Sequence, residues 1–277
     1  MARRRGVNVD GIELSVLTNV DGRPTLLLLH GTFWSRVWEP LVSMLGESVT
    51  AAALDFPGCG RSGGELTEER ASVPELARVA LRAADALGAR EFSVAGHDIG
   101  GAVAQHLAVH QRDRVRQLIL VNSVLYDSWP VPAVARFRDP SVRAATAPAE
   151  FRDGRRTALE QAVSRPLSDD AMAEYLSPWE DERRIRSWIA MAAAADARYT
   201  TELLPALRDH GPPTLALWGE DDEFQPLRYA ERFAADVPTA ELVRIPRAGH
   251  IPMEDDPDRV TAELLAFLEL ITVIEEM

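Results

Sequence analysis

The sequence predicts an α/β fold in which a mostly parallel central sheet is covered by helices on both faces. Residues 25–30 (TLLLLH) and 49–55 (VTAAALD) are continuous apolar runs, which is typical of strands buried on both faces. Further strand-like runs alternate with segments of helical periodicity, as in parallel sheets whose strands are joined by helices. The 277 residues, 46% of them hydrophobic, suffice for one large domain or for a core with an inserted subdomain.

The elements follow one another in a regular order. The chain opens with a predicted hairpin turning at Asp10-Gly11, a strong turn pair. After the two apolar runs, a helix is expected between Ser72, which could form a capping box with Glu75, and Gly88. The remaining elements are strands at 91–96, 117–122, 214–219 and 241–246, and helices at 101–110, at 228–237 and after Pro257.

The middle of the chain differs from the rest in composition and hydrophobic pattern. From Leu125 to about His210 there are no strand-like apolar runs, and alanine, arginine and proline dominate. We interpret residues 125–210 as a helical cap inserted between strands of a core that comprises residues 1–124 and 211–277.

Composition excludes several classes of function. A net charge of −13 argues against binding to nucleic acids or anionic membranes. The chain has no lysine, so lysine Schiff-base chemistry is excluded. The single cysteine, Cys59, cannot form an intrachain disulfide, and neither a signal peptide nor a membrane span is recognisable. We therefore expect a cytoplasmic protein.

Five polar residues directly follow predicted strands: His30, Asp98, Asn122, Asp222 and His250. Parallel sheets bind ligands beyond the carboxyl ends of their strands. We therefore expect these side chains to gather along one edge of the sheet and to form the functional site.

Five motifs in order resemble those of the α/β-hydrolase fold family: HGTFW, DFPGCGRS, GHDIGG, LWGEDDEFQP and AGHIPMEDDP. The resemblance covers nearly the whole chain and implies an order of nucleophile, acid and histidine. Asp98 then stands at the centre of the nucleophile elbow, where serine is usual, and His250 and Asp222 complete the catalytic triad. By the same resemblance, the backbone N–H groups of Thr32 and Ile99 form the oxyanion hole.

An aspartate at the elbow changes the chemistry. A carboxylate is ionised at neutral pH, and its attack on a saturated carbon yields an ordinary alkyl ester. His250 could then activate the water that hydrolyses this ester, with Asp222 orienting its ring. Within the family, an elbow aspartate resembles epoxide hydrolases and haloalkane dehalogenases.

The leaving group separates these two reactions. Haloalkane dehalogenases typically carry halide-binding side chains where this chain has Thr32 and Ile99, and relatives that defluorinate haloacids place an arginine directly after the aspartate. We therefore expect an epoxide to be opened to a diol. The alkoxide needs a proton, which a cap tyrosine could donate, and we favour Tyr199 over Tyr126 and Tyr175.

The expected substrate is a small apolar or neutral organic molecule. Trp34 and Trp129, each following a strand end, and Phe33, which stands where relatives usually have proline, are predicted to line its pocket. We expect neither a cofactor nor a metal ion, and the oligomeric state stays open, with a homodimer as the candidate. The alternatives are a haloalkane dehalogenase and a non-hydrolytic cyclase or isomerase in which Asp98 acts only as a base.

Overall fold

The computed structural model describes residues 2–275, with side chains described for residues 2–269. Its strands join in a single eight-stranded sheet with the order β1-β2-β4-β3-β5-β6-β7-β8. They are β1 (Arg3–Val9), β2 (Ile12–Thr18), β3 (Leu26–Leu29), β4 (Ala51–Leu54), β5 (Phe92–Asp98), β6 (Val115–Ser123), β7 (Thr214–Gly219) and β8 (Ala240–Ile245).

The sheet is parallel except at one edge. The hairpin of β1 and β2 turns at Asp10 and Gly11, both of which have positive φ, and β2 pairs antiparallel with β4. From β4 through β3, β5, β6 and β7 to β8 all neighbours are parallel. Every residue of β3, β4, β5 and β7 is buried, as the apolar runs predict for strands covered on both faces. The predicted fold class is confirmed.

Helices pack around this sheet. Helix α3 lies against β5 and β6 and contacts α2, whereas α13 lies against β7 and β8 and contacts α1. The core helices are α1 (Glu39–Met44), α2 (Val73–Ala86), α3 (Ile99–His110), α11 (Leu227–Asp236), α12 (Pro252–Asp255) and α13 (Pro257–Glu275). Among the described residues, no helix combines the length and the apolar character needed to cross a membrane.

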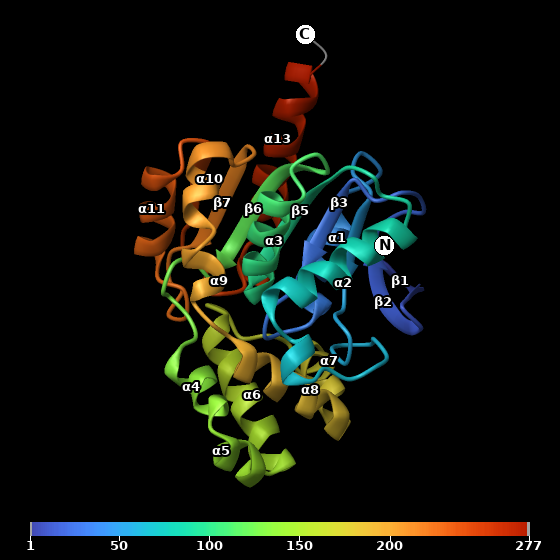
Figure 1. Ribbon diagram of the computed structural model, residues 1–277, viewed down its shortest axis with the longest axis vertical. Helices are drawn as coiled ribbons and strands as arrows, with labels where there is room; N and C mark the ends of the chain where they lie inside the picture. Colours follow the sequence, from blue (N-terminus) through green and yellow to red (C-terminus); the bar gives the residue numbers. More distant parts are fainter. Residues whose placement is uncertain (1, 276–277) are drawn as a thin grey trace.

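The segment between β6 and β7 is helical and contains no described strand. Its helices are α4 (Pro132–Ala135), α5 (Pro140–Ala145), α6 (Pro148–Ala162), α7 (Asp169–Leu176), α8 (Glu182–Ala194), α9 (Arg198–Thr201) and α10 (Leu204–His210). Figure 1 shows α4 to α8 gathered beyond the end of the sheet to which the β6 arrow points. Helices α9 and α10 instead contact α3 of the core, so the separate helical layer consists of α4 to α8 and ends near Ala194. We call this layer of α4 to α8 the cap.

The turn from β5 into α3 brings three segments unusually close. Asp98 at its centre has φ 54° and ψ −125°, a conformation that costs a residue with a side chain about 1–3 kcal/mol. A Cβ on Gly96 would lie 2.3 Å from the carbonyl oxygen of Gly100, and one on Gly100 would lie 2.3 Å from that of Leu29. Only glycine fits at these positions, and the tight packing in turn holds Asp98 in its strained conformation.

One local expectation is wrong. Ser72 does occupy the N-cap of α2, but its side chain makes no capping hydrogen bond. Glu75 instead pairs with Arg78, three residues further along the helix, through an Nη2–Oε2 contact of 2.9 Å. The helix forms without the capping box because its apolar face, which includes Leu76, Ala80 and Ala83, is buried.

We predict that Gly100→Ala lowers the free energy of unfolding by roughly 1–3 kcal/mol or more, because backbone atoms at the end of β3 block the added methyl group. Gly154→Ala in α6 is the matched control. Nothing lies within 4 Å of a Cβ there, and we expect a gain of up to about 1 kcal/mol from helix propensity. Denaturant unfolding measures both changes, and equal stability of the two variants would contradict the close approach at the turn.

Candidate active site

Asp98 presents its carboxylate to two donors on the loop after β3. The backbone N–H and the side-chain hydroxyl of Thr32 both donate to Asp98 Oδ2, each at 2.8 Å. No described residue donates to Oδ1, and the carboxylate makes no capping bond to α3. Oδ2 is therefore held in place by Thr32, while Oδ1 has no hydrogen-bond donor among the described residues and is available to react.

The loop that carries Thr32 is held by His30. The backbone N–H of Phe56 donates to His30 Nε2 at 3.1 Å, so the proton lies on Nδ1, which donates to the carbonyl oxygen of Gly31 at 2.9 Å. Burial lowers the pKa of His30 and favours this neutral form over the influence of Asp55 and Asp98, which act in the opposite direction. His30 thus acts as a structural link between the ends of β3 and β4.

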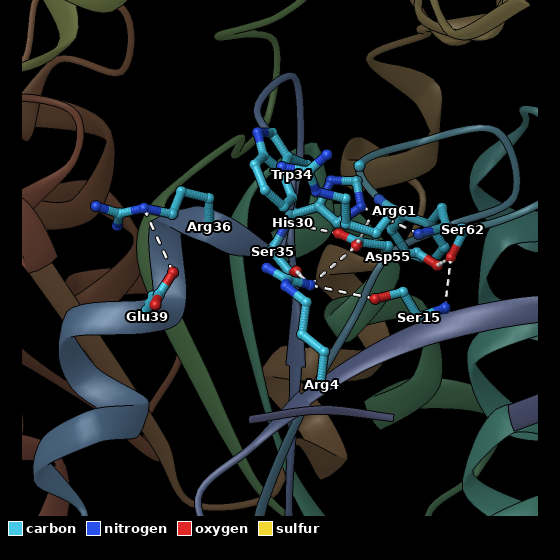
Figure 2. A network of polar contacts seen from close by, with 12 residues as sticks. Arg4, Ser15, His30, Trp34, Ser35, Arg36, Glu39, Asp55, Arg61 and Ser62 are labelled. Atoms are coloured by element: carbon cyan, nitrogen blue, oxygen red, sulfur yellow. Dashed lines mark hydrogen bonds and ion pairs between the residues drawn. The ribbon is translucent and has the colours of Figure 1, made fainter. Parts of the chain in front are cut away.

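A second set of bonds anchors the same loop further along, as Figure 2 shows. The fully buried carboxylate of Asp55 accepts hydrogen bonds from the backbone N–H groups of Ser35 at 2.8 Å and Arg61 at 3.0 Å. The Arg4 side chain, reaching in from β1, adds an ion pair to Asp55 at 3.2 Å. The loop after β3 therefore rests on a charged anchor that several hydrogen bonds hold in place.

His250 follows β8 and is oriented by Asp222, which follows β7. Its Nδ1 lies 2.9 Å from Asp222 Oδ2, and Asn122 of β6 donates to the same oxygen at 2.7 Å. The other oxygen, Oδ1, accepts the backbone N–H groups of Phe224 at 2.8 Å and Gln225 at 2.9 Å. Asp222 is thereby fixed on both oxygens and holds the His250 ring with Nε2 free for proton transfer.

The charges in this arrangement set the protonation of His250. Burial alone would lower the pKa of His250, but the charge of Asp222 and the hydrogen bond to it hold that pKa above its ordinary value of 6.5. The same contacts outweigh burial at Asp222 and keep its pKa below its ordinary range. Burial and the nearby His250 together lower the pKa of His97 to about 4, so His97 stays neutral and contacts the His250 carbonyl oxygen at 2.8 Å.

Asp98 and His250 open onto one cavity of about 350 Å³ between the sheet edge and the cap. Its walls are mainly apolar and come from both the core and the cap. They include Phe33, Ile99, Val124, Trp129, Val134, Phe137, Phe151, Ala158, Trp188 and Phe224. A cavity of this size suits a small organic molecule.

Arg155 of α6 also lines this cavity, and it is a residue that the sequence reasoning missed. Its guanidinium lies over the rings of Phe33 at 4.4 Å, Trp188 at 4.8 Å and Trp179 at 5.0 Å. Burial lowers the pKa of Arg155 to about 9 against the opposing effect of the Asp98 carboxylate, so the side chain keeps its charge at neutral pH. No sequence pattern distinguishes it from the other arginines of the helical segment.

Four residues predicted to surround the nucleophile do line the cavity: Thr32, Ile99, Phe33 and Trp129. Thr32 is more than a backbone donor, because its hydroxyl also holds Asp98. Ile99 begins α3, where a first-turn N–H has no partner within the helix and could serve the oxyanion hole.

Two residues that the sequence places in the site lie elsewhere in the structure. Trp34 lies outside the main cavity, and its indole N–H donates to the carbonyl oxygen of Tyr175 at 3.1 Å, so it joins the core to the cap. Tyr199 is half-buried in a separate hollow beside Asp196 and Arg138. The reason is topological: Tyr199 belongs to α9, which packs on α3 and not among the cap helices above Asp98.

The other two tyrosines of the segment between β6 and β7 are engaged elsewhere. The hydroxyl of Tyr126 donates to Asp236 and that of Tyr175 to Glu254, each at 2.8 Å. Of the four tyrosines, the last, Tyr229, lies on α11. None of the four contributes to the cavity lining. Across residues 2–269, no group of three or more histidine, cysteine, aspartate or glutamate side chains could hold a metal ion.

The chain is similar to known proteins over most of its length. Residues 26–263 match the model of a family described as "Alpha/beta hydrolase family". The chain is 30% identical over 261 residues to haloalkane dehalogenase 2 of Mycobacterium bovis, which covers 87% of both chains.

Two solved structures are similar over nearly their full length. An alpha/beta hydrolase fold protein from Burkholderia ambifaria has a TM-score of 0.83 at 26% identity, covering 95% of this chain and 97% of that one. The epoxide hydrolase CorEH has a TM-score of 0.83 at 24% identity, covering 98% of this chain and all (100%) of that one.

We predict that His250 titrates above pH 6.5, because Asp222 stabilises its protonated form. A base must be neutral, so any step that uses His250 should lose rate as the pH falls through this raised value. Asp222→Asn should move the titration to lower pH. NMR of the imidazole signals measures this without a substrate, and His106, whose pKa is lowered to about 4 by burial and His110, is the internal control. A His250 titration unchanged in the variant would contradict the assigned pairing.

Proposed function

Because the chain belongs to the alpha/beta hydrolase family, in the branch of the haloalkane dehalogenases and epoxide hydrolases, we propose that it hydrolyses its substrate through an alkyl ester on Asp98. The observation that carries this proposal is the state of the Asp98 carboxylate. Thr32 holds Oδ2 with two hydrogen bonds, no described residue donates to Oδ1, and His250 opens onto the same cavity.

In the first step, Asp98 Oδ1 attacks a saturated carbon of the substrate. A carbon–oxygen bond forms, and the bond to the leaving group breaks with both electrons going to that group. The fixed position of Oδ2 orients Oδ1, and the strained turn pushes the carboxylate clear of the sheet.

In the second step, His250 takes a proton from water, and the water oxygen attacks the carbonyl carbon of the Asp98 ester. The negative charge that develops falls on Oδ2, the oxygen that Thr32 already holds. Asp222 stabilises the His250 cation, and that proton then goes to the departing alcohol. Asp98 is regenerated as a carboxylate.

The cavity favours a halide over an epoxide as the leaving group. An epoxide oxygen leaves as an alkoxide and needs a proton donor, but no tyrosine hydroxyl lines the cavity. A halide leaves as a stable anion and needs no proton donor. We therefore rank dehalogenation first, which reverses the order that the sequence favours.

Epoxide opening is the second candidate, and one observation favours it. The side chains at the two positions where haloalkane dehalogenases typically hold the halide are unsuited here. The Thr32 hydroxyl is committed to Asp98, and Ile99 has no polar side-chain atom.

We predict that His250→Gln accumulates the ester, because the glutamine cannot act as the base of the second step. Mass spectrometry of the Asp98 peptide after incubation with a bromoalkane should show the added alkyl group. Asp98→Asn is the matched control and should show no adduct and no turnover. The two-step scheme would be contradicted if the wild-type enzyme turns over a substrate but the His250→Gln variant forms no adduct with it under rapid quench.

We also predict that wild-type enzyme releases halide from bromoalkanes faster than it forms diols from epoxides of matched size. Halide release and diol formation are followed separately in the same series. Diol formation without halide release would make epoxide opening the first candidate again. It would not contradict the proposal of an Asp98 ester.

A further inference from the structure

The Arg155 side chain is a buried cation without a matching anion. The residue is 7% exposed, and no carboxylate of residues 2–269 forms an ion pair with it. Its Nε atom has no hydrogen-bond partner, and Nη2 donates to the carbonyl oxygen of Thr32 at 3.2 Å. Buried charges in proteins are normally paired and hydrogen-bonded, so this arrangement is costly unless a ligand completes it.

The contact with Thr32 does not account for a charged group at this position. The Thr32 carbonyl already accepts a shorter hydrogen bond, 2.8 Å long, from the indole N–H of Trp188. A neutral donor would hold the loop without the cost of burying a charge. Arginine, however, offers a planar fork of N–H groups that matches a carboxylate, and the rings of Phe33, Trp179 and Trp188 fix its orientation.

Among the described charged groups around the cavity, Asp98 is the one that compensates this cation. His250 is itself paired with Asp222, and the rim residues Arg136 and Glu150 are exposed to solvent. Asp98 is the carboxylate that influences Arg155, and it loses its charge when it becomes an ester. At that stage the cavity would hold a desolvated guanidinium with no negative partner from the protein.

We propose that Arg155 binds a carboxylate carried by the substrate, so that the enzyme acts on halogenated carboxylates in preference to neutral haloalkanes. This inference rests on the proposed function and replaces the neutral substrate that the sequence predicts. The aromatic and aliphatic walls then contact the carbon chain between the carboxylate and the reacting carbon.

The reaction balances for such a substrate. Asp98 Oδ1 displaces the halide, which leaves with the bonding electrons. Water then supplies a hydroxyl group to the ester carbon of Asp98, and the alcohol oxygen departs with the product. The products are a hydroxycarboxylate, a halide ion and a proton, while the substrate carboxylate stays bound to Arg155 unchanged.

The test compares ω-bromocarboxylates of increasing chain length with the bromoamides of the same length, which are nearly isosteric and neutral. Bromide release gives kcat/KM for wild type, Arg155→Gln, Arg155→Lys and Arg156→Gln. Arg156 neighbours Arg155 on α6 and is exposed, so its variant is the control for the loss of one positive charge.

We expect wild type to prefer an acid to its amide. Arg155→Gln should lower kcat/KM for the acid about tenfold to a hundredfold more than kcat/KM for the amide, mainly through KM. Arg155→Lys should retain part of the preference and Arg156→Gln all of it. An equal loss of kcat/KM for acid and amide would overturn the proposal. It would mean that Arg155 acts by supporting the loop that carries Thr32 or by stabilising the leaving halide.

A binding measurement separates this inference from the proposed function and from a folding defect. Calorimetry compares unhalogenated carboxylates with their amides on wild type, and on the variants shown by circular dichroism to be folded. Carboxylate binding that exceeds amide binding and is lost in Arg155→Gln supports the Arg155 site even if no bromide is released. Equal binding of carboxylate and amide by wild type would overturn it even if haloalkanes are turned over.

Discussion

The close approach between the end of β3 and the start of α3 is the constraint on which the site depends. Because Gly96 and Gly100 carry no side chains, α3 begins directly beside the loop that follows β3, and the turn between β5 and α3 takes up a strained backbone conformation at Asp98. That proximity brings both donors of Thr32 to the same carboxylate oxygen. The two oxygens of Asp98 thus become inequivalent before any substrate arrives, which is what a two-step ester mechanism requires.

The cap completes the site from the opposite side and is bound to the core by polar contacts. Arg36 of the core pairs with Glu174 of the cap at 2.6 Å and with Glu254 of the core at 2.7 Å. Nearer to Asp98, Arg155 and Trp188 both donate to the carbonyl oxygen of Thr32, the residue whose N–H donates to the Asp98 carboxylate. The cap therefore contributes the cavity wall, its cation and part of the support of the loop that holds Asp98.

Much of the core was predictable, because buried parallel strands, turn glycines and residues after strand ends leave local signals in the sequence. Asp98 ends β5, Asp222 follows β7 and His250 follows β8, and the topology brings such positions to one edge. The helical cap has no comparable local signals that would fix the position of each side chain relative to the site. Tyr199 lies away from the cavity because α9 packs on α3, and Trp34 does so because it bridges core and cap. The burial of Arg155 depends on three rings distant in sequence, which no local pattern reveals.

We propose that Asp98 attacks carbon, and the origin of the product oxygen is the most direct test of this attack. A single turnover in heavy-oxygen water, with enzyme in excess over a bromocarboxylate or bromoalkane, separates the two routes. If Asp98 is the nucleophile, the first product carries an unlabelled oxygen from the protein and the label appears in the Asp98 carboxylate, because water attacks the ester carbonyl. If Asp98 or His250 acts only as a base on water that attacks the substrate, the first product is labelled and Asp98 stays unlabelled, which would contradict the account.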